Sequence, residues 1–276
     1  GHEYHIRRTC EKYGADHIIC VMSGNFTQRG EPAVWDKWVR TRAALLGGAS
    51  LVLELPFAYA TQSAEGFAEG GVAILDALNC VDALSFGVET TDLAALSQAA
   101  SLLSAEPNDF QAALKTGLGA GLSFPVARAQ ALTACLPAAD AATWQQPNNI
   151  LAIEYLKAII RRGSALRPLP IERLGGGYSE SVLTPGYASA RAIRAAIKKG
   201  DASYLRYIPN AEAVPSIDPV FGEALFPLLM FQLRRRDTAK IGNIYGVAEG
   251  LEYRICEAAK KAQGYEDLVT AIASKR

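Results

Sequence analysis

The chain has 276 residues, half of which are hydrophobic, and its 28 basic residues balance its 28 acidic ones. This length and composition allow a substantial core, and the even charge excludes a polycation that binds nucleic acid over its whole surface. Five scattered cysteines without a C-x-x-C pair argue against a disulfide framework and a zinc site, and without a signal peptide or a long uncharged apolar run we expect a cytoplasmic protein.

Helix and strand patterns alternate through the first half of the chain. The apolar spacing predicts helices at residues 2–13, 36–47 and 62–78 and strands at residues 17–22, 51–55 and 82–86. This alternation is typical of α/β proteins with parallel strands and right-handed crossovers. We therefore expect the loops that follow the strands to converge on one edge of the sheet, where ligands of open α/β folds bind.

The loop after the first predicted strand, at residues 22–33, has the composition of an anion site. Gly24 and Gly30 allow the backbone to approach a ligand closely, and Arg29 supplies a positive charge. An ordinary surface loop with a Gly-Glu-Pro turn is the alternative. We expect the loop to contribute to a site because other motifs accompany it.

Glu54 interrupts the apolar strand pattern at residues 51–55. A carboxylate in such a run must be paired or functional, because an unpaired buried charge is costly. A salt bridge to a neighbour such as Arg40 is the simpler interpretation. Lys37 and Arg40 lie one helical turn apart and can point together, or they can belong to a solvated helix face.

Helical patterns dominate the middle of the chain. We predict helices at residues 91–104, 107–116, 123–136 and 147–162, and we interpret residues 90–146 as a helical insertion. Asn148 is suited to cap the last of these helices. A strand at 167–173 then ends at Arg173, before three glycines, and residues 201–276 are predicted as a helical C-terminal region after a catalytic region at 1–200.

Basic residues are concentrated between Ile150 and Gly200, where nine of them stand against three acidic residues, a local excess of six. The basic residues are Lys157, Arg161, Arg162, Arg167, Arg173, Arg191, Arg194, Lys198 and Lys199. Such an excess is the electrostatic pattern expected of an RNA-binding face. A set of solvated helix faces is the alternative. A further basic run, Arg234-Arg235-Arg236, follows in the C-terminal region.

A series of short motifs in a fixed order is more specific than any one of them. The motifs are His2-Glu3-Tyr4-His5, Met22-Ser23-Gly24 through Ala33, Lys37-Trp38-x-Arg40-Thr41, Leu53-Glu54-Leu55-Pro56, Phe86-Gly87, Pro147-Asn148-Asn149-Ile150-Leu151, Ala188-Ser189-Ala190 with Ile193-Arg194, and Glu249-Gly250-Leu251-Glu252-Tyr253-Arg254-Ile255. The series resembles the bacterial tRNA(Met) cytidine acetate ligase family, which is similar to the nucleotidyltransferases of the His-x-Gly-His type. This resemblance implies a Rossmann-like open parallel sheet with a helical insertion and a mostly helical C-terminal region.

The resemblance also implies which residues hold ATP. Gly1-His2 matches the second half of the His-x-Gly-His signature, in which histidines and the amides of a helix N-terminus hold nucleotide phosphates. Ser189 and Arg194 resemble the second signature, which grips the β- and γ-phosphates; a capped basic helix is the alternative. The implied catalytic residues are His2, Arg29, Ser189 and Arg194. The implied ATP-binding residues are Gly1, His2, Glu3, Tyr4, His5, Gly87, Asn148, Arg173, Ser189 and Arg194.

Members of this family use ATP and acetate to acetylate N4 of the wobble cytidine of elongator tRNA(Met). The resemblance therefore implies ATP as substrate with Mg²⁺ bridging its phosphates, acetate and tRNA as partners, and an acetyl-adenylate intermediate formed without a protein nucleophile. The alternatives are another nucleotidyltransferase that adenylylates or cytidylylates a small acid or phosphate, and a non-catalytic RNA-binding relative.

Two features depart from the family pattern. A member would carry a strand and an Asn-Pro-Phe-His-Asn loop before Gly1, and further helices rich in arginine and aromatic residues after Arg276, so we expect a truncated or incompletely represented protein. In the second signature, Arg191 and Ala192 stand where the superfamily often has Thr or Ser.

Overall fold

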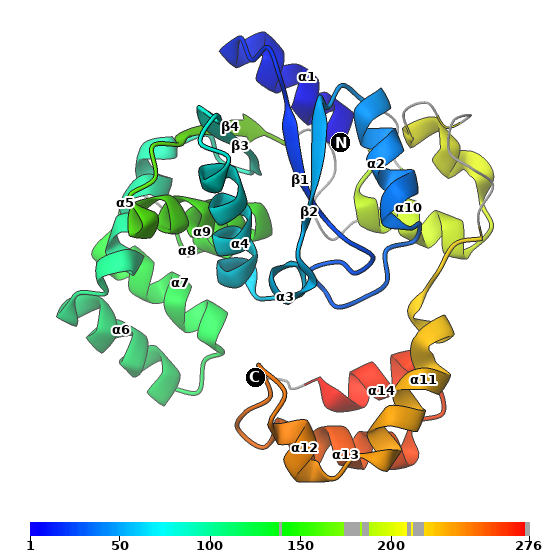
Figure 1. Cartoon of the computed structure of the whole chain (residues 1–276). Coiled ribbons are helices and arrows are strands. Elements are labelled where there is room, and N and C mark those ends of the chain that lie inside the picture. The colour runs from blue at the N-terminus through cyan, green and yellow to red at the C-terminus, as the bar shows by residue number, and fades with distance from the viewer. Residues whose placement is uncertain (138–139, 174–182, 184–187, 209–210, 212–217, 274–276) are drawn as a thin grey trace. The chain divides into compact units, whose positions relative to one another are not determined.

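The computed structural model describes residues 1–273 except 138–139, 174–182, 184–187, 209–210 and 212–217 (Figure 1). Its contacts divide the chain into two compact units. The α/β unit comprises Gly1–Gly30 and Trp35–Pro219, and the C-terminal unit comprises Glu31–Val34 and Val220–Arg276.

The described strands of the α/β unit form two parallel pairs, which confirms the predicted fold class. Strand β1 (Ile19–Ser23) pairs with β2 (Leu51–Leu55), and β3 (Ala83–Val88) pairs with β4 (Arg167–Glu172). Gly87 lies opposite Ile171 inside β3, so the strand extends beyond its predicted end. Residues of β1 pack against the same core cluster that contains Leu84 and Phe86 of β3, so both pairs share one hydrophobic core.

Helices connect and cover these strands. They are α1 (His2–Tyr13), α2 (Lys37–Leu46), α3 (Phe57–Ala60), α4 (Ala64–Ala77), α5 (Leu93–Ala105), α6 (Asn108–Gly119), α7 (Phe124–Cys135), α8 (Ala141–Gln145), α9 (Pro147–Arg162), α10 (Ala190–Lys198) and the 3-10 helix η1 (Ala202–Tyr207). Between β3 and β4 the described chain is helical, and α9 packs against both α4 and α5 (Figure 1). The short helices α3 and α8 were not predicted, because one helical turn is too short for a periodic pattern.

Ion pairs between α9 and α4 use much of the predicted basic excess. Lys157 Nζ lies 3.2 Å from Glu65 Oε1, and Arg161 Nη1 lies 2.6 Å from the same oxygen. Arg162 Nη1 lies 2.9 Å from Glu69 Oε1. These three basic residues therefore contribute to the packing of α9 on α4, which is the role that the alternative of helix faces implies.

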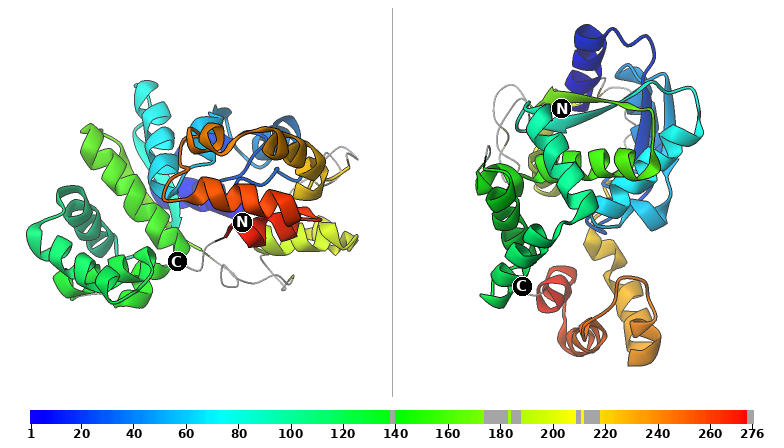
Figure 2. Two further views of the ribbon diagram at one scale, coloured as in Figure 1. Left: turned by 90° about the horizontal axis from the view of Figure 1, so that it is seen from below. Right: turned by 90° about the vertical axis from the view of Figure 1, so that its left-hand side faces the viewer.

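The C-terminal unit is helical. It contains α11 (Gly222–Arg235), α12 (Thr238–Gly242), α13 (Leu251–Lys261) and α14 (Tyr265–Ile272), which lie together in both views of Figure 2. Its small core consists of Met230, Ala258, Ala259, Ala262 and Leu268. No helix in the described part of either unit has the length and apolar content needed to cross a membrane.

Candidate active site

The first turn of α1 carries both histidines of the candidate site. The helix ends before Gly14, which is its C-cap residue. Gly14 adopts the left-handed conformation with a φ of 66°, and its backbone N–H donates a hydrogen bond to the Cys10 carbonyl. At the opposite end, Gly1 is the N-cap residue and no described side chain caps the helix, so its first N–H groups can receive an anion. His2 is exposed at this end, and His5 lies one turn further and is half-buried.

Three hydrogen bonds fix where the neutral His5 ring carries its proton. Thr9 Oγ1 donates to the His5 carbonyl over 2.9 Å, so it must accept from Ser85 Oγ, which lies 2.8 Å away. Ser85 has then used its proton and must accept from His5 Nε2, at 2.8 Å. The neutral ring is therefore protonated on Nε2, and Nδ1 is left as an acceptor.

Two arginines make the surroundings of the histidines positive. Arg173 follows β4, and its side chain lies against Gly87, where an added Cβ would come within 3.3 Å of Arg173 Cγ. Gly87 thus leaves room for this side chain. Arg40, on α2, donates from Nη2 to the Ser23 carbonyl at the end of β1 over 3.0 Å, which holds the guanidinium at the strand end.

These surroundings lower the pKa of both histidines. Although part of His2 is open to solvent, the atoms around its ring lower its pKa by desolvation first, and the positive charges of Arg173 and Arg40 lower it further. The pKa of His5 is lowered to about 4 by desolvation, His2 and Arg173. Both rings are therefore neutral at pH 7 and act through hydrogen bonds, whereas the arginines supply the permanent charge.

An NMR titration tests the state of His5. We expect His5 to be the Nε2–H tautomer at pH 7 and to titrate near pH 4. The ring binds a proton more tightly in the unfolded protein than in the folded one. His5 should therefore lower the free energy of unfolding as the pH falls from about 6.5 to about 4. The Ser85→Ala variant should show mixed tautomers in ¹⁵N spectra. A midpoint near 6.5, or an unchanged tautomer in that variant, would contradict this hydrogen-bond chain.

Arg29 is not among the charged groups that lower the pKa of His2 and His5. It is exposed on a turn in which the Gly30 N–H donates to the Thr27 carbonyl over 2.9 Å, and Gly30 has a φ of 73°. Gly30 is therefore needed for its backbone conformation. The arginines whose charges act on His2 are Arg173 and Arg40, and the role of Arg29 stays a prediction.

Glu54 is paired with a different residue from the predicted one. Its Oε2 lies 2.5 Å from Lys37 Nζ at the start of α2, whereas Arg40 donates to backbone carbonyls. A Cβ added at Gly24 would collide with the Glu54 carboxylate. The close approach at Gly24 is thus made by a side chain of the protein itself.

Asn148 does not cap α9, so that prediction is wrong. Gln146 occupies the N-cap position, and Glu89 at the end of β3 supplies the acceptor instead. The Glu89 carboxylate accepts from the backbone N–H of Asn149 over 2.9 Å and from the Asn148 side-chain amide over 2.5 Å. Fully buried Asn149 returns the contact by accepting from the Glu89 N–H over 3.0 Å. The start of α9 is thereby fixed near the carboxyl end of β3.

Ser189 is the N-cap residue of α10, and its side chain accepts from the Ala192 N–H over 3.0 Å. Its role as a cap is thus observed. Arg194 lies further along the same helix, which packs on η1. Residues 174–182 and 184–187, which separate Arg173 from this helix, lie outside the described part of the chain.

The structure thus brings together part of the predicted set. Gly1, His2, His5, Gly87 and Arg173 gather at the first turn of α1. Glu3 and Tyr4 belong to the same turn. Asn148 is held by Glu89, and Ser189, Arg194 and Arg29 lie on other elements. Ser85 and Glu89 were not predicted as partners of the site, because each contacts a residue that is distant in sequence.

A Gly-His pair at a helix N-terminus, set beside parallel strands, is the arrangement of a His-x-Gly-His nucleotidyltransferase. A family model described as HIGH Nucleotidyl Transferase matches residues 1–276. The chain is 40% identical to the tRNA(Met) cytidine acetate ligase of Caldanaerobacter subterraneus and 42% identical to that of a Thermoanaerobacter species, with 100% of this chain and 71% of each relative covered. The chain belongs to the tRNA(Met) cytidine acetate ligase family, which confirms the family resemblance.

Solved structures agree with this assignment. The apo crystal structure of Thermotoga maritima TmcAL is 34% identical, with a TM-score of 0.93 over 100% of this chain and 68% of that chain. A second crystal structure of the same protein, bound with alpha-thio ATP, is 35% identical, with a TM-score of 0.90 over 100% of this chain and 67% of that chain. The predicted nucleotidyltransferase fold is therefore confirmed.

Proposed function

We propose that this protein is an ATP-dependent ligase that acetylates N4 of the wobble cytidine in elongator tRNA(Met), with acetate as the acyl donor. The observation that carries the proposal is the first turn of α1, where His2 lies near Arg173 and Arg40 and beside backbone N–H groups that no described side chain caps. Membership of the ligase family and the alpha-thio ATP complex of the Thermotoga maritima relative support it.

In the first step, an acetate oxygen attacks the α-phosphorus of ATP, and the bond to the bridging oxygen breaks to release pyrophosphate. In the second step, the cytidine amine attacks the acetyl carbon, loses a proton and expels AMP. The first step needs positioning and charge neutralisation more than a protein nucleophile. His2 donates a hydrogen bond to the α-phosphate, and Arg173 neutralises phosphate charge.

The remaining predicted contacts extend this site. Gly1, Glu3, Tyr4 and His5 line the nucleotide from α1, and Gly87 and Asn148 contact it from the edge of the strands. Ser189 and Arg194 hold the β- and γ-phosphates, and Arg29 contributes charge to the reacting groups. For Ser189 this requires one hydroxyl both to cap α10 and to meet a phosphate, which a helix N-terminus permits.

Mg²⁺ accompanies ATP in this proposal. Among the described residues, no group of three or more acidic, histidine or cysteine side chains could hold a metal ion. The described side chains of the site are assigned to the phosphates.

We further propose that residues 201–276 bind RNA and that the enzyme works in the cytoplasm, where its tRNA is used.

Acetate-dependent exchange of labelled pyrophosphate into ATP tests the proposed first step. The wild-type protein should catalyse it without tRNA. Arg173→Gln should raise the KM for ATP by about 10- to 100-fold, because its charged hydrogen bonds to phosphate are removed. It should also raise the pKa of His5, which Arg173 helps to lower.

Arg167→Gln is the matched control, because Arg167 is exposed at the opposite end of the same strand. It should leave the KM and the His5 titration unchanged. Exchange with another acid but not with acetate would favour a different nucleotidyltransferase. Binding of tRNA without any binding of ATP would identify a non-catalytic relative.

A further inference from the structure

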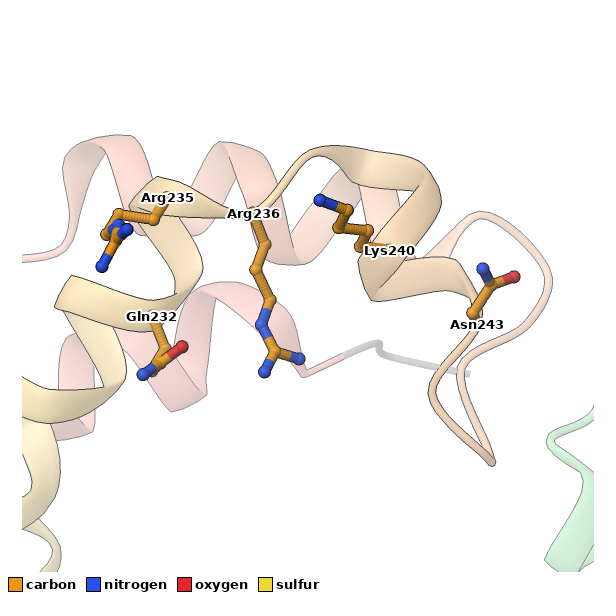
Figure 3. Close-up of a pocket in the computed structure, with 5 residues that line it drawn as sticks. All are labelled: Gln232, Arg235, Arg236, Lys240 and Asn243. Atoms are coloured by element: carbon orange, nitrogen blue, oxygen red, sulfur yellow. The ribbon is translucent and has the colours of Figure 1, made fainter.

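The C-terminal unit contains an open hollow of about 530 Å³ whose lining is entirely basic or amide (Figure 3). It is lined by Gln232, Arg235, Arg236, Lys240 and Asn243. Three positive charges thus face one space together with two amide groups that can donate hydrogen bonds. This combination is suited to phosphate oxygens.

All three arginines of the run are exposed, and Arg234 also ties two helices together. Arg234 Nε donates to the Ala259 carbonyl over 3.0 Å and so ties α11 to α13. Arg235 stacks its guanidinium over the Phe231 ring at 4.9 Å, which holds its direction. In Figure 3 the Arg236 side chain extends between those of Gln232 and Lys240.

The carboxylate nearest in sequence to these charges is engaged elsewhere. Asp237 caps α12 by accepting from the Lys240 backbone N–H over 2.8 Å. Ile241, which is fully buried, anchors the same helix. Within the described part of the chain, no carboxylate forms an ion pair with Arg235, Arg236 or Lys240, so their charges are available to an external anion.

An exposed aromatic side chain follows the last lining residue of the hollow closely in sequence. Ile244 and Val247 close a tight turn through a hydrogen bond of 3.0 Å, and Gly246 adopts a φ of 86° within it. Tyr245 therefore stands at the tip of the turn, two residues after Asn243, and is 85% exposed. Basic groups beside an exposed ring are the combination that binds single-stranded nucleic acid, because unpaired bases stack on aromatic rings.

We propose that this hollow binds the phosphate backbone of an unpaired RNA segment and that Tyr245 stacks on one of its bases. The inference deepens the proposed function, since the RNA would be the tRNA substrate, and it assigns the contact to a loop instead of a paired stem. Paired bases are stacked within their helix and offer no face to Tyr245. A backbone phosphate can accept two N–H hydrogen bonds from one guanidinium, which suits the two arginines that line the hollow.

Binding of an elongator tRNA(Met) transcript at several salt concentrations tests the site. The double variant Arg235→Gln/Arg236→Gln should bind about tenfold more weakly, and the slope of log affinity against log salt should fall by about 0.7 for each phosphate that the protein no longer neutralises. The control Lys260→Gln/Lys261→Gln removes the same charge from α13, outside the hollow, and should change the affinity much less. Tyr245→Ala should weaken binding of a stem-loop by about fivefold or more, but not that of a loop-free duplex.

Unchanged affinity and salt slope in the arginine variant would overturn the inference, as would equal losses in the lysine control. Loss of binding to inorganic pyrophosphate or ATP, with tRNA binding intact, would assign the hollow to a free phosphate compound instead. Acetate-dependent exchange reports on the proposed function separately. If exchange is absent but the arginines still govern RNA binding, the proposed reaction fails and this site stands.

Discussion

Replacing His2 with alanine is expected to slow acetate-dependent ATP–pyrophosphate exchange by about 10²- to 10³-fold, the usual effect of removing one preorganised donor from a developing charge. His2 lies at the N-terminal end of α1, near Arg173 and Arg40. Since its pKa is lowered, the ring is neutral at pH 7 and acts by donating a hydrogen bond. The loss should therefore appear mainly in kcat, because Arg173 and the helix N–H groups still bind ATP.

Two further histidine variants make this expectation specific. His17→Ala removes an exposed histidine outside the site and should leave exchange unchanged. His2→Gln keeps an N–H donor and should recover part of the rate. Equal exchange in His2→Ala and His17→Ala would refute the role of His2, whereas a rise in KM with unchanged kcat would make His2 a binding residue only.

Local sequence patterns predicted the helices and strands of the site better than the side chains that contact its residues. Helix α1 has the predicted bounds, because Gly14 gives a clear stop and Gly1-His2 a recognisable start. The Ser85 contact could not be predicted, since 80 residues separate it from His5. A hydroxyl in a strand gives no sign of which side chain it will meet.

The partners of charged residues were also difficult to predict from the sequence. The sequence shows that Glu54 needs a partner and that Lys37 and Arg40 share a helix face, but not which one reaches the strand. The same holds for the basic excess after Ile150, part of which faces the carboxylates of α4. Counting charges along a segment does not reveal a neighbour that is distant in sequence.

Glu154→Ala is expected to lower the free energy of unfolding by about 3–5 kcal/mol, the usual cost of breaking a buried ion pair. Glu154 has 4% of its side-chain surface exposed, and its oxygens lie 2.6 Å from Arg128 Nη2 and 2.7 Å from Lys157 Nζ. Lys157 is also buried, with Glu65 as its other partner at 3.2 Å. Without Glu154, Lys157 would keep its charge in the core with less compensation. Urea unfolding measures the difference.

Surface and apolar replacements separate the cost of an orphaned charge from the value of the pair. Glu69→Ala removes the partner of Arg162 at a site where the side chain is 38% exposed, and should cost at most about 1 kcal/mol. Glu154→Leu/Lys157→Met removes both buried charges and should recover much of the loss, because an apolar pair carries no desolvation penalty. If the double variant were as unstable as Glu154→Ala, the loss would come from the Arg128–Glu154 pair between α7 and α9 and not from the orphaned charge of Lys157. If Glu154→Ala matched Glu69→Ala, solvent would be screening Lys157, and the cluster would contribute no more than a surface pair.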